Sequence, residues 1–214
     1  RLFAEHRYVV AVGGSGLYIQ ALCNGMDTLP EADESIRTEL KQRFATEGLE
    51  SLVEQLRTLD PCYADQVDVH NPSRVMRALE VCIATGRPYS EQRSGRPAVR
   101  PFNIIKVGTD MPRDILYDRI NRRVDMMIEQ GLEQEARAMY PKRHLNALQT
   151  VGYRELFDYF DGRSSFEEAI ELIKRNSRRY AKRQLTWFRR DESIGWYSPD
   201  DFGAIVGFID SYKS

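Results

Sequence analysis

The amino-acid sequence predicts an α/β fold in which a block of helices interrupts a parallel sheet layer. Three short runs with strand character, near residues 8–12, 103–109 and 194–198, are separated by longer segments of helical periodicity. Strands that alternate with helices favour a parallel sheet, since a parallel connection needs a crossover. The segment from 33 to 86 has only helical signals, so we interpret it as an insertion into the α/β layer.

Composition is typical of one globular protein with a sizeable core, or a core with a small appended domain. The chain has 214 residues, of which 42% are hydrophobic and 29% charged, and its formal net charge is -1. No apolar run approaches the roughly 20 residues that cross a bilayer, and the first residues lack a signal-peptide pattern. We therefore expect a cytoplasmic protein. The three cysteines and three histidines are scattered, which predicts neither a disulfide framework nor a metal site.

The first predicted strand, "RYVVAV", leads through "GGSG" into a helical pattern that begins at Leu17. Glycines after a strand allow a tight turn and bring backbone N–H groups towards an anion at the following helix. Gly13 and Gly14 are therefore candidate cofactor-binding residues, and the alternative is a tight turn without a ligand. The segment is neither a Walker A loop nor a complete G-x-G-x-x-G motif.

Capping residues mark three helices in the inserted block. Asp33 precedes the first helix, a second follows Gly48, and Asn71 with Pro72 opens the third, which Gly86 ends. A loop rich in Arg, Ser, Gly and Pro, residues 89–101, then leads to the second predicted strand.

The last third of the sequence predicts two long helices and the third strand. One helix begins near Arg113, and the other follows a capping box formed by Ser165 and Glu168. Three strands are fewer than the five typical of a sheet. The chain also begins at an Arg within an apparent helix, so we expect a further segment to precede Arg1.

Two arginines on the helix that begins near Arg113 predict an anion site. Arg119 and Arg123 are four residues apart and share a helix face, where an anion such as a diphosphate would relieve their repulsion. The alternative is pairing with aspartates, as Asp118 would pair with Arg122.

A strongly basic stretch, "RNSRRYAKRQLTWFRRD", stands out in a chain of almost no net charge. From Lys174 to Arg190 there are eight basic residues and no acidic one. Such a stripe suits a nucleic-acid backbone, with Tyr180 and Trp187 stacking on bases. The alternative is a solvated helix face whose aromatic residues pack in the core. The residues expected to form the stripe are Arg175, Arg179, Lys182 or Arg183, and Arg190, and those expected to face the core are Ile173, Tyr180, Leu185 and Phe188.

Four segments, "VGGSGLYIQAL", "NPSRVMRALEVCIATGRPYSE", "LQTVGYREL" and "RRYAKRQLTWFRRD", resemble the bacterial tRNA dimethylallyltransferase family in order and spacing, over nearly the whole chain. The resemblance implies transfer of a dimethylallyl group from dimethylallyl diphosphate to N6 of the adenosine 3′ of a tRNA anticodon. It also implies a P-loop NTPase-like parallel sheet core with an inserted all-helical domain. In this sequence residues 1–28 would be part of the core, 29–100 the insertion that binds the anticodon stem-loop, and 101–214 the rest of the core with a C-terminal basic helix.

The resemblance also implies roles for individual residues. Arg123 matches the catalytic arginine that binds the substrate diphosphate, and Ser15 replaces a threonine usual in the family while keeping the hydroxyl. The residues implied to contact tRNA are Ser15, Arg37, Ser73, Arg74, Val75, Met76, Arg77, Gln149, Thr150, Val151, Gly152, Tyr153, Arg154, Lys182, Arg183, Gln184, Leu185, Thr186, Trp187, Phe188 and Arg189.

The family's phosphate-binding loop and catalytic aspartate would precede Arg1. We therefore expect Mg²⁺ to bind mainly outside these residues, and we expect residues 1–214 alone to be inactive and monomeric. Three alternatives remain open at this point: an adenylate isopentenyltransferase that makes cytokinin, a non-catalytic RNA-binding module, and a P-loop nucleotide kinase. The first would not need the helical insertion or the predicted tRNA contacts.

Overall fold

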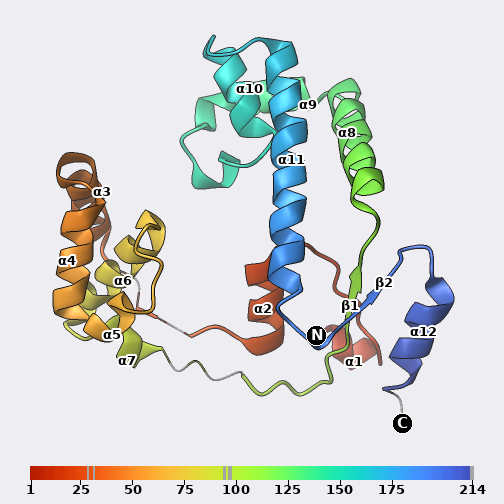
Figure 1. Ribbon diagram of the computed structural model, residues 1–214, viewed down its shortest axis with the longest axis horizontal. Helices are drawn as coiled ribbons and strands as arrows, with labels where there is room; N and C mark the ends of the chain where they lie inside the picture. Colours follow the sequence, from red (N-terminus) through yellow and green to blue (C-terminus); the bar gives the residue numbers. More distant parts are fainter. Residues whose placement is uncertain (28, 31, 94, 96–97, 213–214) are drawn as a thin grey trace. The chain divides into compact units, whose positions relative to one another are not determined.

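The computed structural model describes the whole chain except residues 28, 31, 94, 96–97 and 213–214 (Figure 1). Contacts divide the chain into two compact units. One, called here the α/β unit, comprises Arg1–Ile19 and Phe102–Ser214, and the other, the helical unit, comprises Gln20–Pro101. Each unit has its own cluster of buried apolar side chains. The functional domains proposed for residues 1–28, 29–100 and 101–214 stay a prediction.

Local capping forms the helices of the helical unit, as the sequence predicts. Asp33 accepts a hydrogen bond from Ser35 N, Asn71 accepts one from Arg74 N, and Gly86 ends its helix at a φ of 67°, in the left-handed region that favours glycine. The helices that lie within or enter this unit are α2 (Gly16–Asn24), α3 (Glu34–Glu47), α4 (Leu49–Leu59), α5 (Pro61–Ala64), α6 (Pro72–Thr85) and α7 (Tyr89–Gln92).

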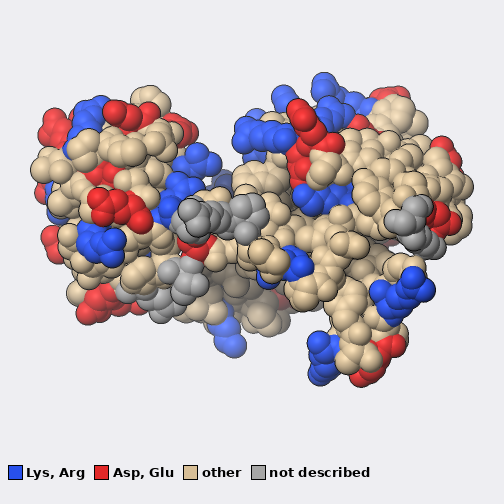
Figure 2. All heavy atoms as spheres, turned by 90° about the horizontal axis from the view of Figure 1, so that it is seen from below, with Lys and Arg blue, Asp and Glu red and all other residues tan. Residues whose placement is uncertain are grey.

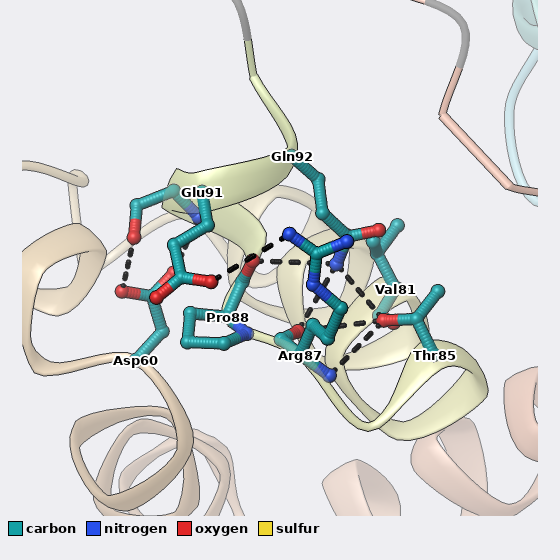
Figure 3. A network of polar contacts seen from close by, with 8 residues as sticks. Asp60, Val81, Thr85, Arg87, Pro88, Glu91 and Gln92 are labelled. Carbon is teal, nitrogen blue, oxygen red and sulfur yellow. Dashed lines mark hydrogen bonds and ion pairs between the residues drawn. The ribbon is translucent and has the colours of Figure 1, made fainter.

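The start of the predicted loop 89–101 is a short helix, α7, and a buried carboxylate explains the difference. Asp60 is 1% exposed and accepts hydrogen bonds from Ser90 N at 2.7 Å and Ser90 Oγ at 2.8 Å. Figure 3 shows Asp60 beside a second group of contacts, in which Gln92 Nε2 donates to Thr85 Oγ1 at 2.9 Å. The hydrogen bonds between Asp60 and Ser90 join residues 30 apart in the chain and hold α7, and local sequence signals do not encode them.

The α/β unit contains two of the three predicted strands. β1 (Lys106–Thr109) and β2 (Ile194–Tyr197) pair in parallel, with Lys106 opposite Ile194 and Thr109 opposite Tyr197. The helices of this unit are α1 (Leu2–Glu5), α8 (Arg113–Glu129), α9 (Leu132–Met139), α10 (Tyr153–Phe160), α11 (Phe166–Phe188) and α12 (Phe202–Asp210), with 3₁₀ turns at Tyr140–Lys142 and Asn146–Leu148.

The prediction of a strand near residues 8–12 is wrong. This segment is described as irregular backbone, and its valines are largely in solvent, with Val10 85% and Val12 94% exposed. A strand needs a neighbour to pair its N–H and C=O groups, and the sheet of the described residues consists of β1 and β2 alone. The described chain is therefore mostly helical with a small parallel sheet.

Helix α11 is fixed at its N-terminal half by a capping box and a hydrophobic core. Ser165 Oγ accepts from Glu168 N at 3.1 Å, and Ser165 N donates to Glu168 Oε2 at 2.8 Å, as the sequence predicts. Ile173 is 1% exposed and belongs to the cluster that α8, α9 and α10 complete with Val124, Ala136 and Phe157. This packing anchors the helix, whose C-terminal half carries most of the basic stretch.

In the part of the chain that the structure describes, no helix has the length and apolar character of a membrane span.

Candidate nucleic-acid interface

Three of the eight basic residues between Lys174 and Arg190 are engaged within the protein. Lys174 Nζ lies 2.8 Å from Asp125 and 3.1 Å from Glu171, and these contacts, the first above all, raise the pKa of Lys174 above its ordinary value. Arg178 donates to Asn121 Oδ1 at 2.6 Å, and Arg189 pairs with Asp110. Because their charges have partners on neighbouring elements, these cations help to hold α11 in place.

The other five basic residues form an exposed stripe. Arg175, Arg179, Lys182, Arg183 and Arg190 are exposed, and none of them forms a salt bridge with an acidic side chain in the described ranges. Arg179 follows Arg175 by four residues, and Lys182 and Arg183 follow Arg179 by three and four, so these four residues share one side of α11. Figure 2 shows that Lys and Arg side chains on the visible face gather in groups with Asp and Glu between them, so basic charge is local.

The aromatic residues of α11 are more exposed than a core role requires. Tyr180 is 42% exposed, although the sequence pattern predicts it on the core side, and Trp187 is 39% exposed. The Arg183 guanidinium lies 5.6 Å from the centre of the Tyr180 ring, a cation–π distance. Ile173 is buried as predicted, and Leu185 and Phe188 are half-buried. Tyr180 is therefore a surface aromatic beside a cation, because the part of α11 beyond Ile173 is less fully covered.

The glycine segment that follows residues 8–12 packs directly against α11. Gln184 Nε2 donates to the Gly14 carbonyl at 2.8 Å, and a Cβ on Gly14 would lie only 2.0 Å from that nitrogen. A Cβ on Gly16 would lie 2.4 Å from the Trp187 indole. Gly16 therefore allows the close approach of the Trp187 ring, a role that sequence reasoning missed, whereas at Gly14 the flexible end of Gln184 could shift to accommodate a Cβ. Binding of a cofactor by Gly13 and Gly14 stays a prediction.

A shallow hollow of about 190 Å³ lies where these two segments meet. It brings Ser15 together with the basic helix, so two of the predicted tRNA-contacting segments share one surface. Its lining residues are Gly14, Ser15, Gly16, Leu17, Tyr180, Arg183, Gln184 and Trp187. The hollow thus combines a hydroxyl, a guanidinium and two aromatic rings.

Substituting Gly16 with Ala is expected to destabilise the α/β unit by about 1–3 kcal/mol, because the added methyl group would overlap the Trp187 ring. Denaturant unfolding followed by Trp fluorescence, in a Trp196→Phe background so that Trp187 reports alone, measures this. Gly13→Ala is the matched control, since its Cβ would meet only Ile19 Cδ1 at an ordinary 3.5 Å. Equal stability of the two variants would contradict the packing argument.

Arg123 lies on α8 and is exposed, as is Arg119. Neither forms a salt bridge with a described acidic residue, whereas Arg122 pairs with Asp118 at 2.6 Å, as the spacing predicts. Among the described residues, Arg123 is not one of those that line the hollow beside Ser15. Binding of a diphosphate by Arg123 stays a prediction.

The segment 149–154 is held to α11 by a buried carboxylate that sequence reasoning missed. Glu155 is 4% exposed and accepts from Gly152 N at 2.8 Å and from Asn176 Nδ2 at 2.7 Å. Gly152 has a φ of 104°, which favours glycine, and a glycine followed by an acid three residues later is a local signal for this cap. Thr150 and Arg154 remain exposed, so this segment presents side chains to solvent from a rigid base.

In the helical unit, the predicted tRNA-contacting residues fall into surface and core positions. Ser73 and Arg74 are exposed at the start of α6, whereas Val75 is fully buried, and contact of Val75 with tRNA stays a prediction. Arg77 and Arg37 each pair with Glu80 at 3.2 Å.

No cluster of three or more His, Cys, Asp or Glu side chains within the described ranges is arranged to hold a metal ion. Binding of Mg²⁺ stays a prediction.

Comparison with known proteins identifies the family. A sequence model of the IPP transferase family matches residues 1–191. A tRNA dimethylallyltransferase 1 of Bacteroides thetaiotaomicron is 48% identical over 209 residues, which cover 98% of this chain and 68% of that protein. The full-length tRNA isopentenylpyrophosphate transferase of Bacillus halodurans has a TM-score of 0.57 and 40% identity, over 94% of this chain and 64% of that structure. A eukaryotic dimethylallyltransferase acting on tRNA, with a TM-score of 0.65 and 22% identity, shares the fold. The chain therefore belongs to the IPP transferase family.

Proposed function

We propose that this chain acts in tRNA modification, in the transfer of a dimethylallyl group from dimethylallyl diphosphate to N6 of the adenosine 3′ of the anticodon. Relatives that carry the name tRNA dimethylallyltransferase support the activity. The structural observation that carries the proposal is the exposed stripe of α11 beside Ser15, because its cations lack acidic partners among the described residues.

The stripe suits an RNA backbone for an electrostatic reason. Neighbouring cations repel one another, and phosphates that line up along the helix would relieve this repulsion and release bound counterions. Tyr180 and Trp187 offer aromatic faces of the kind that stack on unpaired bases. Single-stranded anticodon loops provide both phosphates and unstacked bases, so this surface favours a stem-loop over a duplex.

The chemistry requires an accessible adenine. An N6 amine within a stacked loop cannot reach an allylic carbon, so the base must leave the stack, at a cost of a few kcal/mol that backbone contacts offset. The N6 nitrogen then forms a bond to the allylic carbon while the carbon–oxygen bond to diphosphate breaks, and N6 loses a proton. Arg123 is proposed to stabilise the charge that develops on the leaving diphosphate.

The parallel pairing of β1 and β2 supports a further proposal, that these strands belong to a P-loop NTPase-like core. Parallel strands require crossover connections, and the segment between β1 and β2 contains the helices α8 to α11.

Binding and transfer test the proposal separately. Residues 1–214 are expected to bind an unmodified anticodon stem-loop, and a filter-binding titration measures this. With the intact parent protein, label transferred from radiolabelled dimethylallyl diphosphate to tRNA, and lost when the adenosine is replaced by guanosine, would support the reaction. Label in free AMP would favour an adenylate isopentenyltransferase instead. Transfer by residues 1–214 alone would contradict the expectation that they are inactive by themselves, and failure to bind the stem-loop would contradict the proposed function.

A further inference from the structure

Glu80, on α6, is a buried acid that faces two arginines from different helices. The residue is 7% exposed, and each of its carboxylate oxygens accepts from one guanidinium. Arg37 Nε, on α3, lies 3.2 Å from Oε1, and Arg77 Nη1, one turn before Glu80 on α6, lies 3.2 Å from Oε2. A single carboxylate therefore holds two cationic side chains next to each other.

Both arginines also reach the surface. The side chain of Arg37 is 41% exposed and that of Arg77 is 38% exposed, while the Glu80 side chain is 9% exposed. The Arg77 guanidinium carries five N–H donors in a fixed plane, and its hydrogen bond to Glu80 uses Nη1. The carboxylate thus lies behind the two guanidinium groups, and solvent can reach them.

Such an arrangement reduces the conformational freedom that binding would otherwise remove. A free arginine side chain loses rotamer entropy when a ligand orders it, and a partner that fixes the side chain in advance lowers this cost. Arg74, three residues before Arg77, adds a third exposed cation and forms no salt bridge with any acid that the structure describes. The surface as a whole therefore suits a phosphate-bearing ligand despite the acid beneath it.

We propose that Glu80 is a positioning residue for tRNA binding, which orients Arg37 and Arg77 towards neighbouring phosphates of the bound RNA. This inference rests on the proposed function, since it takes tRNA as the ligand. The proposed role predicts the opposite change in RNA affinity from the one that net charge alone predicts when Glu80 is neutralised. Removal of a negative charge near a polyanion site should strengthen binding, whereas loss of a positioning group should weaken it.

Glu80→Gln is the informative variant because it keeps the size of the side chain and removes its charge. A glutamine can accept from one guanidinium only, since its NH₂ group would face the N–H donors of the other. We expect about a ten-fold loss of affinity for the unmodified anticodon stem-loop, the value of one charge-assisted hydrogen bond. Glu50→Gln, at a 75% exposed side chain of the same unit, is the matched control for loss of one negative charge. It is expected to leave affinity unchanged or slightly raised.

A second route does not depend on the folding of the Glu80 variant. Arg77→Lys keeps the charge but lacks the planar fork that can engage Glu80 and a phosphate together, so we expect weaker binding at unchanged net charge. Circular dichroism confirms the fold of each variant. Wild-type affinity in folded Glu80→Gln, or wild-type affinity in Arg77→Lys, would overturn the positioning role while leaving the proposed function intact. Failure of the wild-type chain to bind the stem-loop would instead overturn both.

Discussion

Replacing Arg179, Lys182 and Arg183 together with Gln is expected to weaken tRNA binding and to flatten its dependence on salt. All three are exposed, and none is engaged with a described acid, so their charges are available to phosphates. Each lost phosphate contact reduces the slope of log affinity against log salt by roughly 0.7–0.9, so three contacts would reduce it by about 2 to 3. Titrations of the stem-loop at several salt concentrations measure this slope.

Lys174→Gln is the matched control on the same helix. Lys174 is paired with Asp125 and Glu171, so its replacement is expected to lower the melting temperature and to leave the salt slope unchanged. Arg189 was expected from the sequence to contact tRNA, but it pairs with Asp110 and is therefore left out of the triple variant. An unaltered slope in a folded triple variant would remove this stripe from the RNA interface.

Arg123→Ala is expected to reduce transfer far more than tRNA binding. If the guanidinium stabilises the departing diphosphate, its loss should raise the transition-state barrier by about 2–4 kcal/mol, a reduction of roughly 30- to 1000-fold in turnover. Steady-state kinetics with dimethylallyl diphosphate, in a protein preparation with transfer activity, measures the first effect, and stem-loop titration measures the second.

Arg122→Ala provides the comparison for this prediction. Arg122 is the preceding residue on α8, is also exposed, and has Asp118 as its partner, so its loss is expected to change turnover little. Equal reductions of turnover and of tRNA affinity in Arg123→Ala would move Arg123 from the diphosphate to the RNA surface.

The features that the sequence predicts well are those that neighbouring residues determine. The caps at Asp33 and Asn71 and the capping box at Ser165 form within one helical turn, so their residue types alone indicate where helices begin. The two paired strands were also predicted, with their parallel direction. The segment 8–12 has the composition of a strand but no described partner, which shows that pairing, rather than composition, makes a strand.

The features that the sequence does not predict depend on residues far apart in the chain. Glu80 and Arg37 are separated by 43 residues, and Gln184 and Gly14 by 170. No periodicity or motif links such pairs, so the buried carboxylate beneath two arginines became visible only in three dimensions. Tyr180 was predicted on the core side because helical spacing gives a direction but does not say where the covering elements end.

The division of the chain between the two units has a consequence for how the protein folds during synthesis. The helical unit is one continuous segment, Gln20–Pro101, so all of it has been synthesised before α8 begins. Residues 14–16, in contrast, pack on side chains of α11 that are translated about 170 residues later. Residues 14–16 therefore cannot make these contacts until α11 has been synthesised. A nascent chain that is arrested once Pro101 has left the ribosomal exit tunnel should thus carry a protease-resistant helical unit, while the residues before Gln20 remain protease-sensitive.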